Sequence, residues 1–193
     1  IGTDSDRALL LDFQATLEIK PEKAIKLEKD ALAKIENITA DNARLVSNLH
    51  ANLGGLYRMN GHPDLAREHM EKSISLLDQF NLLHINDSIP QIANYAMFLT
   101  EQQEPERVIS ELQKLSGIIK EYHSDDCLDY AKVQETLGTI YLMTANLPQA
   151  KTHFKRAFKI YEKIWADEPE MIEAKYQEIQ ELYPQIGFCI GKN

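Results

Sequence analysis

The sequence predicts an all-α protein built from about four similar helix pairs and one closing helix. Two observations carry this prediction. Small or apolar residues return every 42 positions, and prolines return at nearly the same interval. Within each period, apolar residues fall at the three- and four-residue spacing of amphipathic helices. Self-similarity at a fixed period of this length is the sequence signature of repeat architectures.

Several columns of the repeat share this 42-residue period. Two columns are Ala24, Ala66, Val108 and Ala150, and Ala31, Ser73, Leu115 and Ala157. A third, Leu11, Leu53, Tyr95 and Leu137, is followed four positions later by Ala15, Tyr57, Leu99 and Tyr141. We therefore expect a single domain over residues 1–193, with repeats at about 5–46, 47–88, 89–130 and 131–168, a capping helix at 169–184 and an apolar tail at 185–193.

Prolines and N-capping residues predict where the individual helices of each repeat begin. Proline is tolerated in the first turn of a helix, so the second helices are predicted to begin at Pro21, Pro63, Pro105 and Pro148. For the first helices, Asp41 is a suitable N-cap of the second repeat, and Ser88 with Gln91 predicts a capping box in the third.

Two glycines are predicted where paired helices cross. Gly54 and Gly138 occupy one repeat position and are expected to face Ala66 and Ala150. Glycine inside a helix costs about 1 kcal/mol, which close packing must offset.

These residues resemble the tetratricopeptide repeat. The pattern is Leu53-Gly54-x-x-Tyr57 with Ala66 and Ser73 following, and it recurs as Leu137-Gly138-x-x-Tyr141 with Ala150, Phe154 and Ala157. The 42-residue period is similar to that of the kinesin-light-chain-like subclass. The resemblance implies a right-handed superhelical solenoid whose concave face is lined by the first helix of each pair.

Composition excludes several classes of function. The chain has 193 residues, 44% of them hydrophobic, and a formal charge of −9 with no basic half, so direct nucleic-acid binding is not expected. Its apolar runs are only a few residues long, so no membrane span is expected. Two widely separated cysteines fit a reducing, cytoplasmic location. A longer parent chain stays open, because the sequence begins with Ile rather than Met.

The expected peptide-binding residues lie at outward positions of the first helices. They are Asn48, Asn52 and Arg58 in the second repeat, Asn94 and Met97 in the third, and Lys132, Glu135, Thr136 and Thr139 in the fourth.

Asn52 and Asn94 are 42 residues apart, and the resemblance implies an asparagine ladder that holds the backbone of an extended peptide. An amide suits this role, because it both donates and accepts a hydrogen bond. Thr136 continues the column, whereas Leu10 breaks it. The alternative is that these asparagines only bond neighbouring helix ends.

Arg58 is the long cation of this column, and its planar guanidinium could hold a carboxylate. The alternative is a solvated or salt-bridged arginine.

The predicted function is a non-catalytic scaffold that binds a protein or an extended peptide on its concave face. No metal-ligand spacing, cofactor motif or catalytic motif occurs, so neither a cofactor nor an enzymatic activity is expected. A sensor or regulatory module that binds a small ligand or signalling peptide, as part of a larger protein, is the alternative. An enzyme is a third reading without positive support.

Overall fold

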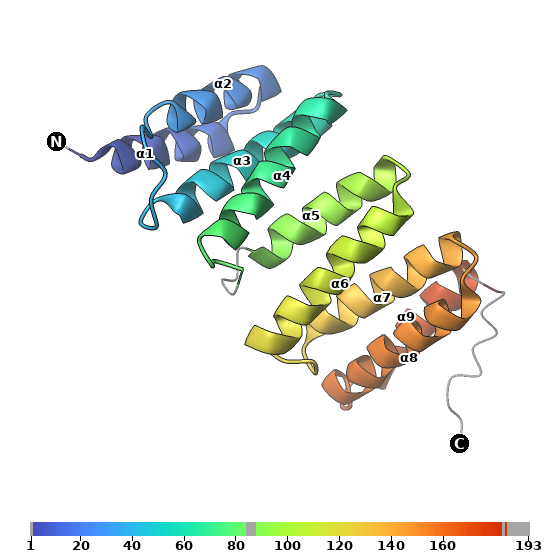
Figure 1. Cartoon of the computed structure of the whole chain (residues 1–193). Coiled ribbons are helices and arrows are strands. Elements are labelled where there is room, and N and C mark those ends of the chain that lie inside the picture. The colour runs from blue at the N-terminus through green and yellow to red at the C-terminus, as the bar shows by residue number, and fades with distance from the viewer. Residues whose placement is uncertain (1, 84–87, 183, 185–193) are drawn as a thin grey trace. The chain divides into compact units, whose positions relative to one another are not determined.

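A computed structural model of the chain is all helical in the residues it describes, which are 2–83, 88–182 and 184 (Figure 1). The described helices are α1 Asp4–Leu17, α2 Pro21–Leu32, α3 Ala43–Met59, α4 Pro63–Gln79, α5 Ser88–Glu101, α6 Pro105–Tyr122, α7 Leu128–Met143, α8 Leu147–Ile164 and α9 Pro169–Leu182. The fold class is therefore the predicted all-α helical repeat. None of these helices is both long and apolar enough to cross a membrane.

The chain divides into two compact units. Unit 1 comprises the residues up to Glu104, with α1 to α5, and unit 2 begins at Pro105, with α6 to α9. In unit 1, α1 pairs with α2 and α3 with α4, while α5 packs against α4. In unit 2, α7 pairs with α8, and α6 and α9 pack against α7 and α8 respectively. The expectation of a single domain over residues 1–193 stays a prediction.

Proline marks the start of each second helix, as predicted. Pro21, Pro63 and Pro105 are the first residues of α2, α4 and α6, and Pro148 is the second residue of α8. A proline here removes an N–H that would have no partner inside the helix, so it fixes the start of the helix without losing a backbone hydrogen bond.

Two predicted caps are wrong. The N-cap of α3 is Asn42 rather than Asp41, and the Asn42 Oδ1 accepts a hydrogen bond from the Thr39 backbone N–H at 2.8 Å. Gln91 does not close a capping box with Ser88, because its carboxamide bonds side chains of α3 and α4 instead.

The small-residue columns lie in the core, as the repeat requires. All eight members of the two columns that contain Ala24 and Ala31 are buried. The predicted close crossings also exist. A Cβ added at Gly54 would lie 2.6 Å from Met70 Cγ and 3.3 Å from the Ala66 carbonyl oxygen.

At Gly138 the nearest neighbour is the Phe154 ring rather than Ala150, with ring carbons 2.8–3.0 Å from the position of an added Cβ. In both helix pairs, the two helices therefore approach too closely for a side chain at the glycine.

The predicted capping helix is α9, which packs on α8. The Tyr176 ring stacks on Phe158 with centroids 4.3 Å apart, and Ile179 is buried. Tyr176 also donates a hydrogen bond from its hydroxyl to Glu162 Oε1 at 2.6 Å. The predicted tail, residues 185–193, lies outside the described residues.

Candidate peptide-binding groove

In unit 1 the first helices α3 and α5 border a pocket of about 130 Å³. Residues of α3, α4 and α5 line it: Ala51, Gly55, Arg58, Met59, Met70, Ser73, Gln91 and Asn94. Two of the predicted site residues, Arg58 and Asn94, are thus brought to one groove. Gly55 leaves its wall open, because an added Cβ there would meet no atom within 4 Å.

Asn94 is the predicted ladder residue that faces outward with its amide free. Its side chain is exposed, and it makes no hydrogen bond to any part of the chain that the structure describes. Met97, one turn further along α5, is also exposed. Asn94 can therefore donate and accept hydrogen bonds with a peptide group at this edge of the groove.

Asn52, the repeat equivalent of Asn94, is less available to bind a peptide. Its amide N–H groups donate to Asp12 Oδ1 at 2.9 Å and to Glu28 Oε1 at 3.1 Å. Both donors of Asn52 are therefore used within unit 1, which leaves its Oδ1 as the atom that could accept from a peptide N–H.

The carboxyl group that Asn52 bonds has an unusual environment. Glu28 is buried. Burial raises its pKa to about 8, and the nearby negative charge of Asp12 adds to the rise. Near neutral pH, Glu28 is therefore mainly protonated, so this cluster carries less negative charge than its two carboxyls suggest.

Arg58 is bound within unit 1. Its Nε and Nη2 donate to the two oxygens of Glu101, at 2.8 and 2.5 Å. The salt-bridged alternative considered for Arg58 thus describes its state here. In this bidentate pair, the carboxylate of Glu101 neutralises the positive charge that would attract a peptide carboxylate. Arg58 therefore forms part of the groove wall as a neutral, hydrogen-bonded pair with Glu101.

The inner wall of the groove is a polar network that the sequence did not predict. Gln91 Oε1 accepts from the hydroxyls of Ser47 and Ser73, and its Nε2 donates to Asn48 Oδ1 at 2.7 Å. The predicted site residue Asn48 is therefore held by Gln91. The sequence did contain a signal for this network, because serines stand at repeat positions whose side chains are buried.

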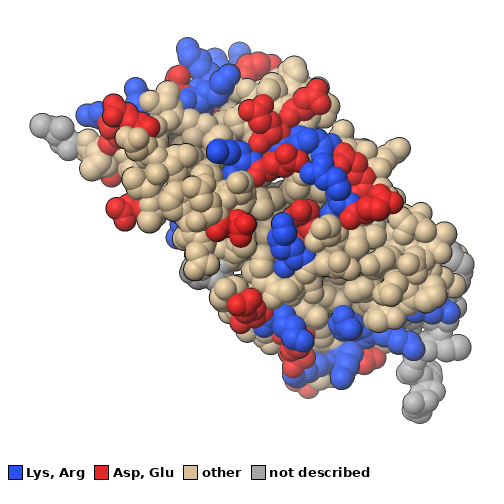
Figure 2. Space-filling view, in the orientation of Figure 1, with Lys and Arg blue, Asp and Glu red and all other residues tan. Residues whose placement is uncertain are grey.

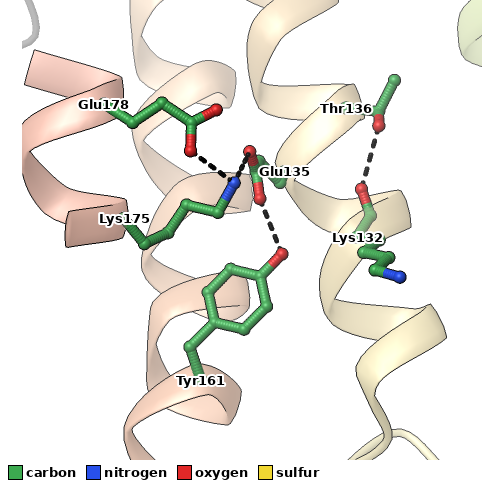
Figure 3. Close-up of polar contacts among 6 residues, drawn as sticks. All are labelled: Lys132, Glu135, Thr136, Tyr161, Lys175 and Glu178. Carbon is green, nitrogen blue, oxygen red and sulfur yellow. Dashed lines mark hydrogen bonds and ion pairs between the residues drawn. The ribbon is translucent and has the colours of Figure 1, made fainter. Parts of the chain in front are cut away.

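The four predicted residues of unit 2 divide into two sets, and Figure 3 labels three of the four: Lys132, Glu135 and Thr136. Glu135 accepts hydrogen bonds from the Tyr161 hydroxyl at 2.6 Å and from Lys175 Nζ at 3.0 Å, and Lys175 also bonds Glu178. Glu135 therefore ties α7 to α8 and α9, and acts as a structural residue in unit 2.

Lys132 and Thr136 lie away from that network (Figure 3). The Thr136 hydroxyl donates to the Lys132 carbonyl oxygen of its own helix at 2.9 Å, and both residues are exposed. Thr139 is half-buried on the same helix. These three residues remain accessible, but none of them supplies a free amide like that of Asn94.

Comparison with known proteins gives a family match for part of the chain and a likeness of fold for most of it. Residues 88–163 match the sequence model of the tetratricopeptide repeat, and solved structures related to kinesin light chain share the fold. Residues 88–163 thus match the tetratricopeptide repeat in sequence. No curated protein sequence matches it.

Three solved structures illustrate the likeness of fold. BtubC (BKLC) from P. vanneervenii aligns with a TM-score of 0.68 at 20% identity, over 82% of this chain and 62% of that one. A putative kinesin light chain with nearly identical TPR-like repeats from Podosopora anserina gives 0.66 at 13% identity, over 96% and 95%. PilF of Pseudomonas aeruginosa gives 0.58 at 21% identity, over 98% and 78%. The chain thus spans less than two thirds of the length of BtubC.

The second and fourth helix pairs also share a tyrosine–histidine contact that sequence reasoning missed. Tyr57 stacks on His69 with centroids 5.4 Å apart, and Tyr141 stacks on His153 at 5.2 Å. The second pair follows the first by 84 residues, which is two repeat periods. This spacing could have revealed the pairs from the sequence.

Each histidine of these pairs has a polar partner from the first helix. His69 Nδ1 lies 2.8 Å from His50 Nδ1, and His153 Nδ1 lies 2.9 Å from Gln134 Oε1. Burial lowers the pKa of all three histidines, that of His50 to about 4. These contacts therefore join α3 to α4 and α7 to α8, and burial favours the neutral form of each histidine ring. Within the described ranges, no three His, Cys, Asp or Glu residues are placed to hold a metal ion.

Proposed function

We propose that the chain is a non-catalytic peptide-binding scaffold that takes an extended peptide into the groove between α3 and α5 of unit 1. The observation that carries this proposal is the exposed, unpaired amide of Asn94 at the edge of that groove. In this proposal the site is narrower than the nine predicted residues, because Asn48 and Glu135 are engaged inside their own units.

The size of the groove favours a peptide over a compact small ligand. Its volume of about 130 Å³ lies below the roughly 300–1,000 Å³ of typical small-molecule pockets. A peptide needs only a narrow channel, because most of its length lies along the surface. This comparison favours the scaffold over the small-ligand sensor that the sequence left as its alternative.

The chemistry of the groove fits a peptide main chain. Asn94 offers a donor and an acceptor, and Asn52 offers its Oδ1, so together they can bond peptide groups whatever the side chains are. Gly55 of α3 lines the same groove as Asn94, with open space in place of a side chain, which allows close approach of another backbone. The Arg58–Glu101 pair borders the groove without a net charge to select acidic peptides.

The test uses the whole chain and a library of random peptides displayed on phage. A selected peptide is then measured by titration calorimetry against two variants. Gly55→Leu fills the groove, and Asn94→Ala removes the free amide. We expect Gly55→Leu to abolish detectable binding and Asn94→Ala to weaken it about tenfold, since a peptide group left unpaired costs roughly 1–3 kcal/mol.

The matched control is Gly117→Leu. Gly117 is an exposed helical glycine of unit 2 at which an added Cβ also meets no atom within 4 Å. It should leave affinity unchanged. Unchanged affinity for Gly55→Leu, with a melting temperature at or above that of the native chain, would contradict the proposed site.

A further inference from the structure

The first helix of unit 1 carries an apolar stripe that its own fold does not cover. Leu9, Leu10, Phe13 and Leu17 are 50–68% exposed. Their spacing of three and four residues places them along one side of α1. Single exposed apolar residues are ordinary on a protein surface, but contiguous apolar patches mark interaction sites.

The repeat register places this stripe on the same face as the groove. Leu9, Phe13 and Leu17 stand 42 residues before three residues of α3 that line the groove: Ala51, Gly55 and Met59. Helix α1 packs directly against α3. The stripe therefore extends the peptide-binding face of unit 1 by one helix, with bulky apolar side chains where α3 has small or flexible ones.

The stripe is distinct from the face by which a further helix pair would stack on α1. That face is marked by repeat positions that are buried in later helices, such as Leu49 of α3 and Phe98 of α5. Their equivalents on α1 are Arg7 and Gln14, which are polar and exposed. Stacking of another repeat therefore does not explain the stripe.

A second copy of the chain is a poor occupant on grounds of area. The four side chains expose roughly 450 Å², which is the size of a functional patch on a monomer and about half of the 800 Å² per partner of a standard interface. A short peptide can cover such a stripe, because only a few of its side chains have to be buried.

Charge defines the rest of the peptide. Unit 1 contains 10 Lys and Arg residues against 16 Asp and Glu residues. Asp4 and Asp6 stand at the N-terminal end of the stripe, and hydrogen bonds from Thr3 hold the pKa of Asp6 below its ordinary value, so it is ionised. In Figure 2, acidic and basic residues are interspersed on the visible face. The excess of acidic over basic residues in unit 1 favours a peptide with basic flanks over an acidic one.

We propose that the binding face of unit 1 takes a peptide whose large apolar side chains pack on Leu9, Phe13 and Leu17 and whose flanks are basic. This inference rests on the proposed function and names its ligand class. The main chain of the peptide bonds Asn94 and Asn52, while α1 selects the apolar residues.

The experiment applies the phage-displayed random library to the whole chain and compares two variants. Phe13→Gln with Leu17→Gln removes the stripe but keeps good helix-forming residues. Leu65→Gln, at a leucine of α4 that is 39% exposed and lies outside the stripe, is the control. We expect selected peptides to be rich in Leu, Phe and Trp with Lys or Arg beside them. The double variant should weaken their binding at least tenfold, and Leu65→Gln should leave it unchanged.

Other outcomes separate this inference from the proposed function. If Gly55→Leu abolishes peptide binding and the stripe variant does not alter it, the inference fails while the groove stands. If no peptide is selected, both fail. A native chain that light scattering shows to be a dimer, together with a monomeric stripe variant, would assign the stripe to self-association and overturn the inference. Binding of the native chain, but not of the variant, to anionic lipid vesicles would overturn it in favour of a membrane surface.

Discussion

Replacing Gly138 by alanine tests the packing that holds the repeats together. The new Cβ would lie 2.8, 2.9 and 3.0 Å from three carbons of the Phe154 ring, which is fully buried. Overpacking of this kind costs about 1–3 kcal/mol. Alanine also improves helix propensity by about 1 kcal/mol over glycine. The net change in the free energy of unfolding should therefore lie between about zero and 2 kcal/mol of destabilisation.

Gly117→Ala separates the effect of the contact with Phe154 from the effect of helix propensity. Gly117 lies inside α6 of the same unit, and an added Cβ there meets no atom within 4 Å. This variant should gain the propensity without the clash. Since 1 kcal/mol shifts the melting temperature by about 2–4 °C in a chain of this size, the two variants should melt about 2–12 °C apart by circular dichroism. Equal stabilisation of both would show that Gly138 does not lie at the crossing of α7 and α8.

Three further predictions concern polar groups inside the units, and each is measured by thermal melts. Because the folded chain keeps a Glu28 proton up to a pKa of about 8 while the unfolded chain loses it near 4.5, stability from this site falls as pH rises through that window. Glu28→Gln should flatten the fall and add about 1 kcal/mol or more at its upper end. For His50, the folded pKa of about 4 lies below the ordinary 6.5, so stability is lost as pH drops between those values. His50→Gln, which copies the residue beside His153, should remove this acid sensitivity. Glu135→Ala should lower the free energy of unfolding by about 1–3 kcal/mol, because the Tyr161 hydroxyl and Lys175 Nζ lose their hydrogen-bond acceptor. Thr136→Ala should change this free energy by less than about 0.5 kcal/mol.

The sequence by itself determined the helices and their order. Helix starts follow from the lost N–H and fixed backbone angle of proline, and the buried faces follow from the 42-residue columns. These signals are local or periodic, so they can be read without coordinates. The glycine crossings were also predicted, although the Phe154 ring as the neighbour of Gly138 was not.

Only the tertiary structure decided which candidate site residues are available. Asn52 and Asn94 are equivalent in the repeat, yet one bonds two carboxyls and the other is free. Arg58 is neutralised by Glu101, which follows it by 43 residues, and Glu135 is held by a lysine 40 residues later. A repeat period fixes which face of a helix a side chain occupies. It does not fix the partner, because that depends on which residue the neighbouring helix presents and on the side-chain rotamers that bring the charged or polar atoms within hydrogen-bonding distance.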